Sequence, residues 1–363
     1  MRYFDDFCSA CAAGCGNQSF FTPSDPSVPL VARAFFRLEV GGEHEYSLLF
    51  SNIIDSTYAD GRHSARNRIC APWRIEGARV CLSADCDCYG LPENKGWIPL
   101  RFGGDLCRDV APGEFFASDA ITLSPRPHEY FCLELTFSGK EIPYHEESLL
   151  PIFAKEGDGW TPTKRMPLPG MIGCRRSVER RVGFIGDSIT QGCGTPHNSY
   201  THYGARIAGA LGDRYSYWDL GLGYGRANDA ASLGAWFYKA KHLDVITVCF
   251  GVNDILQGFS PEQTKKDLYT LVTSLKAAGV TVLLQTIPPF GYQGEKIAHW
   301  KALNTYILTE LAPLVDEVFD VVPLLGLGGE LSHMARYGDH PNAEGHRVWS
   351  EALAPVLMKW LTP

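Results

Sequence analysis

The 363-residue chain lacks the features that would place it at a nucleic acid, in a membrane or in a secretory route. It has no dense run of Lys and Arg, and 33 basic against 41 acidic residues give a formal charge of -8, which disfavours nucleic-acid backbones and anionic membrane surfaces as partners. Its apolar runs fall far short of the ~18 residues that suggest a membrane span. Residues 1–7 are acidic and contain no apolar signal-like stretch. We therefore expect a soluble, cytoplasmic protein.

The twelve cysteines do not form the two C-x-x-C pairs of a zinc ribbon. Two groups of three do occur, at Cys8, Cys11 and Cys15 and at Cys81, Cys86 and Cys88. Cys132 and Cys249 lie in apolar, strand-like runs, where a cysteine behaves as a small buried hydrophobe. We expect reduced structural thiols in a reducing compartment and neither metal nor cofactor, with a zinc site as the less favoured alternative.

The first 170 or so residues lack any long helical pattern, and the whole chain lacks internal repeats and low-complexity tracts. Instead, short β-branched and aromatic runs are separated by Gly, Pro, Asn and Asp, and several alternate apolar with polar residues, as residues 36–40 do. The runs cover residues 34–40, 46–50, 79–83, 121–123 and 130–137. Short strands with frequent turns predict an all-β domain, a β-sandwich or jelly roll, over residues 1–170.

A Gly-, Pro-, Thr- and Arg-rich segment at about residues 156–180 indicates an extended connection between two domains. After it the chain alternates apolar strands with amphipathic helices, which predicts a parallel sheet covered on both faces in a second domain, residues 178–363. The predicted strands are residues 182–185, 215–220, 245–250, 280–286 and 315–321. The predicted helices are residues 200–211, 228–241, 261–278, 297–311 and 343–361.

The first of these strands ends in Gly186-Asp187-Ser188, which places an acid and a serine at its carboxyl end. In open α/β sheets ligands bind beyond the carboxyl ends of the strands, so Ser188 is a candidate nucleophile. The simpler alternative is a strand-to-helix turn in which the serine only caps the helix. Asp187 more simply braces the loop than acts as an acid or base.

Three further segments follow predicted strands or precede the last helix, and each carries polar groups to the same edge. They are a glycine-rich block at residues 219–226, Asn253 within residues 251–254, and His340. Acyl transfer needs a nucleophile, a base within hydrogen-bond reach and donors aimed at the developing oxyanion. Each segment alone also fits an ordinary turn, but together they match that requirement.

The order of Gly-Asp-Ser at residues 186–188, the glycine-rich block, Gly-Val-Asn-Asp at residues 251–254 and His-Pro-Asn at residues 340–342 resembles the SGNH (GDSL-type) esterase and lipase family. The resemblance covers about residues 178–363. It implies a flavodoxin-like three-layer α/β/α sandwich with Ser188 as nucleophile and His340 as base. It also implies an oxyanion hole made by the Ser188 N–H, a glycine N–H and the Asn253 side chain.

The sequence departs from the family pattern at the glycine donor and at the acid. Asp219 stands where the family usually has the Asn of an Asn-x-Gly-x-Ser-Gly pattern, and we predict Gly223 as the donor, with Tyr224, which strict spacing selects, and Gly225 as alternatives. The family commonly has Asp three residues before the His, but that position is Tyr337 here. Asp339 is the predicted acid, and orientation of His340 by a backbone carbonyl, as in Ser-His dyads, stays open.

These expectations describe a serine esterase that removes a small acyl group through an acyl-enzyme. A strand-rich domain before such a catalytic domain resembles two-domain carbohydrate esterases, which implies O-acetyl groups on a sugar or oligosaccharide. A lipase of longer acyl esters is less favoured, because no long apolar flap or amphipathic surface helix is visible. The alternative from another class is a carbohydrate-binding protein with a degenerate hydrolase domain. The sequence leaves the oligomeric state open.

Overall fold

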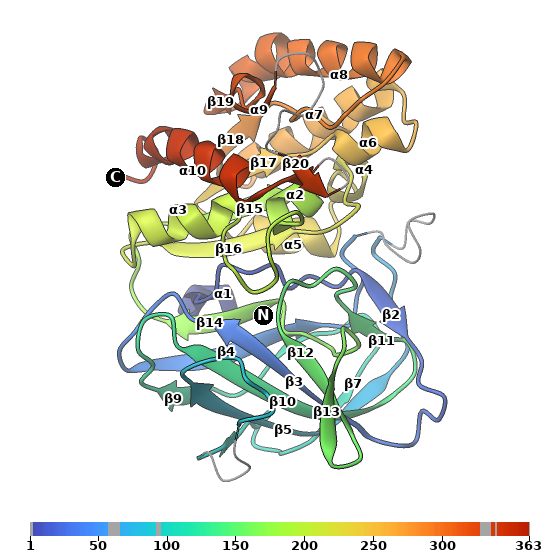
Figure 1. Cartoon of the computed structure of the whole chain (residues 1–363), viewed down its shortest axis with the longest axis vertical. Helices are drawn as coiled ribbons and strands as arrows, with labels where there is room; N and C mark the ends of the chain where they lie inside the picture. The colour runs from blue at the N-terminus through green and yellow to red at the C-terminus, as the bar shows by residue number, and fades with distance from the viewer. Residues whose placement is uncertain (1–2, 57–65, 92–95, 327–334, 338–339, 363) are drawn as a thin grey trace. The chain divides into compact units, whose positions relative to one another are not determined.

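The computed structural model describes residues 3–56, 66–91, 96–326 and 340–362 and the backbone of residues 335–337, and the chain divides into two compact units (Figure 1). The N-terminal unit comprises Met1–Asp55 and Asn67–Ser177. The C-terminal unit comprises Val178–Pro363 together with Ser56–Arg66, a segment from the first part of the sequence. In the described part of the chain, no helix is both long and apolar enough to cross a membrane.

The described strands of the N-terminal unit are antiparallel throughout, and they form two larger sheets and a two-stranded ribbon. One sheet has the order β1-β14-β4-β8 with β9 beside β4, the other β13-β12-β3-β10-β5-β6 with β7 beside β5, and β11 pairs with β2. The bounds are α1 (Tyr3–Asp6), β1 (Cys8–Ser9), β2 (Ser19–Phe21), β3 (Leu30–Arg37), β4 (His44–Ser51), β5 (Trp73–Ser83), β6 (Ile98–Pro99), β7 (Arg108–Val110), β8 (Phe115–Ala117), β9 (Ile121–Leu123), β10 (Tyr130–Gly139), β11 (Ile142–Tyr144), β12 (Ile152–Glu156), β13 (Gly159–Pro162) and β14 (Met171–Arg175). Two of these strands, β13 and β14, lie in the segment that the sequence suggested to be an extended connection.

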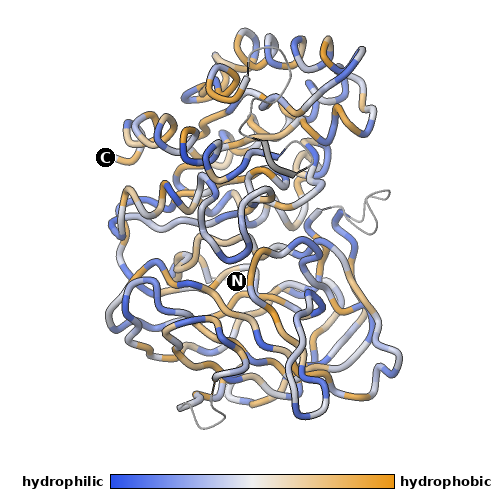
Figure 2. The backbone as a smooth tube through the Cα atoms, in the orientation of Figure 1, coloured by the Kyte–Doolittle hydropathy of each residue, from blue (hydrophilic) through white to orange (hydrophobic). Residues whose placement is uncertain are grey.

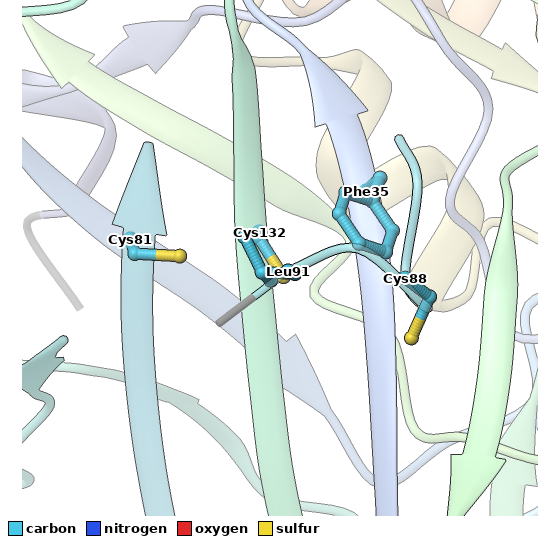
Figure 3. Close-up of a cluster of buried hydrophobic side chains, with 5 residues drawn as sticks. All are labelled: Phe35, Cys81, Cys88, Leu91 and Cys132. Atoms are coloured by element: carbon cyan, nitrogen blue, oxygen red, sulfur yellow. The ribbon is translucent and has the colours of Figure 1, made fainter. Parts of the chain in front are cut away.

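Several cysteines of this unit pack as small hydrophobic side chains. Figure 3 shows Cys81, Cys88 and Cys132 with Phe35 and Leu91 in a buried cluster on β3, β5, β10 and a nearby loop. Burial raises the pKa of the Cys88 thiol to about 11, so the thiol is neutral at physiological pH. None of the twelve cysteines forms a disulfide, and among the described residues no group of three or more His, Cys, Asp or Glu side chains is placed to hold a metal ion.

The C-terminal unit is built on a five-stranded parallel sheet, as the alternation of apolar strands and helices predicted. Its strand order, β16-β15-β17-β18-β19, corresponds to the 2-1-3-4-5 order of flavodoxin-like sheets. The bounds are β15 (Arg181–Gly186), β16 (Ser216–Gly221), β17 (Val245–Cys249), β18 (Thr281–Gln285) and β19 (Glu317–Phe319), with a small antiparallel pair formed by β20 (Ala335–Tyr337) and β21 (His340–Pro341).

Helices cover this sheet, and their sequences alternate hydrophobic and hydrophilic stretches (Figure 2). Helix α3 packs on α10, and α7 packs on α8. Because the chain moves in opposite directions along the sheet before and after β16, right-handed connections put α3 and α7 on opposite faces. The bounds are α2 (Ser188–Gln191), α3 (Tyr203–Leu211), α4 (Ala227–Ala230), α5 (Ala235–Ala240), α6 (Val252–Leu256), α7 (Pro261–Ala277), α8 (Glu295–Tyr306), α9 (Val322–Leu325) and α10 (Ala343–Met358).

Two predicted helices show where the local sequence pattern was correct and where it was wrong. Helix α7 begins as predicted, with the Ser260 hydroxyl accepting the Gln263 N–H at 3.2 Å and Pro261 in the first turn. The single helix predicted over residues 228–241 is instead two short ones. Leu233 interrupts it with a φ of 55°, a left-handed conformation that cannot continue an α-helix.

Candidate active site

The site begins where β15 ends, at the point where the strand order reverses. The chain runs from β15 outward to β16 and then returns to β17 on the other side of β15, so three neighbouring strands deliver their following loops to one edge. In doubly wound sheets this reversal opens the crevice in which ligands bind. The segments after β15, β16 and β17 carry Ser188, the glycine-rich block and Asn253. The structure therefore brings these three predicted segments together.

Ser188 is the first residue of α2 and not its cap. The Asp187 side chain caps the helix, accepting the Ile189 N–H at 2.9 Å, so the capping alternative for the serine is wrong and the bracing role expected of Asp187 is confirmed. Gly186 permits the sharp turn between strand and helix. A Cβ at Gly186 would lie 2.0 Å from Thr190 Oγ1 and 2.5 Å from the Cys249 carbonyl oxygen, which leaves no room for a side chain.

His340 meets Ser188 across 152 positions of sequence. It belongs to β21, and its Nε2 lies 2.7 Å from Ser188 Oγ, the distance of a strong O–H···N hydrogen bond. With the ring proton on Nδ1, Nε2 accepts the serine hydroxyl proton, which is the arrangement of a nucleophile and its base. The predicted acid Asp339 lies outside the described residues.

The glycine-rich block forms a tight turn whose amides are largely engaged. The Gly223 N–H donates to Gln191 Oε1 at 2.6 Å, and the Gly225 N–H donates to the Leu222 carbonyl at 3.0 Å. Tyr224 stands at the third position of the four-residue turn that this second bond closes, with a φ of 58°. A non-glycine residue there is strained, and such strain is concentrated at functional sites. The Gly223 N–H is already engaged with Gln191, which disfavours Gly223 as the oxyanion donor, and the identity of the donor stays a prediction.

Gln191 is a residue that sequence reasoning overlooked. It is buried on α2 three positions after Ser188, and its side chain ties the nucleophile helix to the Gly223 amide. The signal was available, because residues three apart share one face of a helix. A second tie holds the same turn, since Trp236 Nε1 donates to the Leu220 carbonyl at 2.8 Å.

Asn253 lies in the first turn of α6, more than nine-tenths buried, beside the glycine-rich turn. Its Nδ2 donates to the Gly225 carbonyl at 3.0 Å. An amide nitrogen carries two hydrogens, so one N–H fixes the side chain and the other can serve a ligand. The preceding Gly251 has a φ of 127°, and a Cβ there would lie 2.3 Å from Ile287 Cδ1.

Buried ionisable groups surround the two loops. Asp219 accepts the Gly221 N–H at 2.7 Å and lies 3.3 Å from His202 Nε2. Burial raises the pKa of Asp219, and the nearby His202 opposes this rise. Burial raises the pKa of Asp254 to about 7. Arg226 makes a two-bond ion pair with Asp229, at 2.9 and 2.7 Å. These groups fix the backbone of both loops.

A separate groove of about 320 Å³ lies in the N-terminal unit. Its lining includes Glu76, Arg79 and Glu134 on β5 and β10. The charged groups in it already pair within the protein, because Arg79 binds Glu134 at 2.6 Å and Glu76 accepts the Ser138 hydroxyl at 2.7 Å. The groove therefore offers little unpaired charge to a ligand.

Comparison with known proteins agrees with the geometry of the C-terminal unit. Residues 184–348 match the family model of the GDSL-like lipase/acylhydrolase family. No curated protein matches the chain.

Several solved structures are similar to part of the chain. A member of the lipolytic G-D-S-L family from Veillonella parvula is 18% identical, with 49% of this chain and 98% of that chain covered and a TM-score of 0.41. A psychrotrophic esterase from a Pseudoalteromonas species is 15% identical, with 50% and 98% covered and a TM-score of 0.42. A carbohydrate esterase family 3 structure from Talaromyces cellulolyticus is 16% identical, with 51% and 98% covered and a TM-score of 0.40.

Proposed function

From the match of the C-terminal unit to the GDSL-like lipase/acylhydrolase family, which makes the protein a carboxylic-ester hydrolase, we propose that it is a serine esterase. We further propose that it removes short acyl groups, above all acetyl, from a carbohydrate. The observation that carries the proposal is the 2.7 Å distance between Ser188 Oγ and His340 Nε2. A degenerate domain that only binds carbohydrate would have no need of this pairing.

Acylation follows from that geometry. Ser188 Oγ attacks the ester carbonyl carbon while His340 Nε2 takes the hydroxyl proton, giving a tetrahedral oxyanion. The intermediate collapses with cleavage of the bond to the alcohol oxygen, and His340 returns the proton to the leaving alkoxide. Water then attacks the acyl-serine, again giving a proton to His340, and collapse releases the carboxylic acid and restores the Ser188 hydroxyl.

We place the oxyanion donors at Asn253, the Ser188 N–H and the Tyr224 N–H. Asn253 suits the role because one N–H of its amide is fixed by the Gly225 carbonyl. Tyr224 is preferred to Gly223 because strict family spacing selects it and because the neighbouring Gly223 amide already serves Gln191. Removing one such donor costs ~10²–10³ in kcat, which is the expected effect of Asn253→Ala.

Short acyl groups are favoured because the nucleophile has little access to solvent. Ser188 is 8% exposed and Asn253 is 7% exposed, so little space is open at the nucleophile for the acyl group of the ester. We therefore expect p-nitrophenyl acetate and O-acetylated sugars to be hydrolysed with higher kcat/KM than esters of eight or more carbons.

The decisive experiment compares p-nitrophenyl acetate hydrolysis by the wild type and Ser188→Ala. A loss of ~10³-fold or more in kcat is expected, because nucleophile and base act as one unit. Equal rates in the two proteins would exclude the serine mechanism and would favour the carbohydrate-binding alternative. A panel of acetylated mono- and oligosaccharides, compared with esters of increasing chain length, tests the substrate class.

A further inference from the structure

An aromatic side chain, Phe290, packs against the imidazole of His340 and could help to position it, whether or not an acid does so as well. The ring of Phe290 lies 5.0 Å from the His340 ring, centroid to centroid, with the two planes at 81°. This is an edge-to-face contact within the range of favourable aromatic pairs. Phe290 comes from the loop after β18, a segment in which the sequence indicated no functional residue.

The side-chain torsions of a histidine do not by themselves fix the orientation of its ring. Rotation of a histidine ring about its Cβ–Cγ bond has broad, weakly preferred minima, so the torsion alone does not direct Nε2 at Ser188. The hydrogen bond between Ser188 and His340 fixes one edge of the ring. The Phe290 ring stands at 81° to the imidazole plane and restricts rotation of the imidazole from a second side.

The loop that presents Phe290 is held rigidly. The Ile287 N–H donates to Asn304 Oδ1 at 2.7 Å, and the Ile287 carbonyl accepts from Asn304 Nδ2 at 3.0 Å and from Trp300 Nε1 at 2.8 Å. Two prolines, at 288 and 289, then restrict the backbone before Phe290. The ring is 8% exposed. The side chain is thus part of a fixed surface anchored on α8.

A second loop supports the stem of the same histidine. Gly194 has a φ of 95°, and a Cβ at that position would lie 2.9 Å from His340 Cβ and 2.5 Å from the Pro341 carbonyl oxygen. The backbone at residue 194 therefore packs directly on β21. The histidine is in contact on two sides, with its ring on Phe290 and its stem on Gly194.

We propose that Phe290 is a positioning residue that holds the imidazole of His340 in the plane required for proton transfer from Ser188. The proposal rests on the proposed function of the Ser188–His340 pair. Phe290 acts through His340 and need not touch the ester. Its loss therefore lowers the rate of the chemical step and leaves substrate binding nearly unchanged.

The test compares Phe290→Leu, which keeps apolar volume but removes the ring, with Phe290→Tyr, which keeps the ring. An aromatic pair of this kind changes the population of the favoured ring orientation by about 2- to 10-fold. We expect Phe290→Leu to lower kcat for p-nitrophenyl acetate by about that factor with KM within twofold of the wild type. Phe290→Tyr should restore most of the loss.

Phe319→Leu is the matched control, because Phe319 is also 8% exposed in the same unit, on β19. It should lower the melting temperature as much as Phe290→Leu does and leave kcat unchanged. The rate of Ser188 phosphonylation by a small phosphonate ester provides a second readout, since that reaction also uses His340 but involves no substrate turnover.

The outcomes separate the two proposals. An unchanged kcat in Phe290→Leu, or a Phe290→Tyr variant no better than Phe290→Leu, overturns the positioning role while Ser188→Ala still abolishes hydrolysis. A rise in KM without a fall in kcat also overturns it, because Phe290 would then contact substrate. Equal hydrolysis by the wild type and Ser188→Ala overturns both proposals.

Discussion

Asp254 follows Asn253 in α6, and its buried carboxyl group connects the stability of the unit to pH. The Ala227 N–H donates to one carboxyl oxygen at 3.0 Å, and burial raises the pKa to about 7. In the unfolded chain the group ionises near pH 3.8. Between these values the folded state binds more protons than the unfolded state, so this group makes stability fall as pH rises.

Asp254→Asn should remove that dependence. Relative to the variant, the wild type is expected to lose about 1.4 kcal/mol of unfolding free energy per pH unit between pH 4 and 7, roughly 4 kcal/mol in total, with no further change above pH 8. Urea denaturation of both proteins at a series of pH values measures the difference. A difference that stays constant with pH would mean that Asp254 is ionised in the folded protein.

The buried side chain of His346 makes stability depend on pH in the direction opposite to that of Asp254. The ring is fully buried on α10, stacked near Tyr203 and Trp349, and its Nδ1 accepts the Tyr203 N–H at 3.2 Å. Burial lowers the pKa of His346 well below its usual value, so the ring is neutral when folded. Below pH ~6.5 the unfolded chain binds the extra proton, and stability is lost as pH falls.

His346→Asn keeps an acceptor near the position of Nδ1 and removes the titration. We expect the wild type to lose about 1.4 kcal/mol per pH unit relative to this variant as the pH is lowered from 6.5. Since Asp254 has the opposite slope in the same range, the two contributions offset each other in the wild type. The same urea titrations test this, and parallel pH profiles of wild type and His346→Asn would contradict it.

At the scale of elements, the loop that carries Gly194 should tolerate no side chain where it packs on β21. Gly194→Ala introduces both a strained φ and a clash with His340 Cβ and the Pro341 carbonyl. Gly279→Ala is a matched control, because the φ of 84° at Gly279 is also left-handed but nothing lies within 4 Å of the added Cβ. Both should lose about 1 kcal/mol to backbone strain. Only Gly194→Ala should lose substantially more and lower kcat, as measured by denaturation and p-nitrophenyl acetate hydrolysis.

An equal loss in the two glycine variants, with activity retained in both, would show that the loop at residue 194 yields easily. In that case the stem of His340 would have no fixed support from this loop. The measurement therefore also examines one of the two contacts assigned to the histidine.

The elements that the sequence predicted well are those defined by local pattern. The predicted run at residues 182–185 lies within β15, and the run at residues 245–250 contains β17, because unbroken apolar runs bounded by Gly are characteristic of buried parallel strands. Their carboxyl ends could be located for the same reason. Ser188 and Asn253 could therefore be predicted as site residues from the sequence alone.

The rest depends on contacts between distant segments, which leave no local pattern. Phe290 and His340 are fifty positions apart, and nothing in a run containing two prolines indicates an aromatic contact. The break at Leu233, by contrast, had a local sign, because Gly234 follows it and glycine is a poor helix former. The acid role of Asp339 and the sandwich arrangement of the N-terminal sheets stay predictions.

At the scale of the whole molecule, the division into two units with separate cores predicts two unfolding events. Arg33, fully buried in the N-terminal unit, binds Glu134 at 2.7 Å and stacks on Trp160 at 4.1 Å. Arg33→Met breaks this pair while Glu134 keeps its bond to Arg79, so the cost is expected to be ~1–3 kcal/mol. Trp349→Phe in the C-terminal unit removes the 2.8 Å bond to Gln285 Oε1, at a cost of ~1–3 kcal/mol.

Each variant should therefore lower only one of two calorimetric transitions. A unit of this size shifts by roughly 2–4 °C per kcal/mol, so both displacements are measurable. Since Ser188 and His340 both belong to the C-terminal unit, loss of esterase activity on heating should follow the transition that Trp349→Phe moves and be unaffected by Arg33→Met. A single transition lowered by both variants would mean that the two units unfold together, and the N-terminal unit would then be required for the stability of the site.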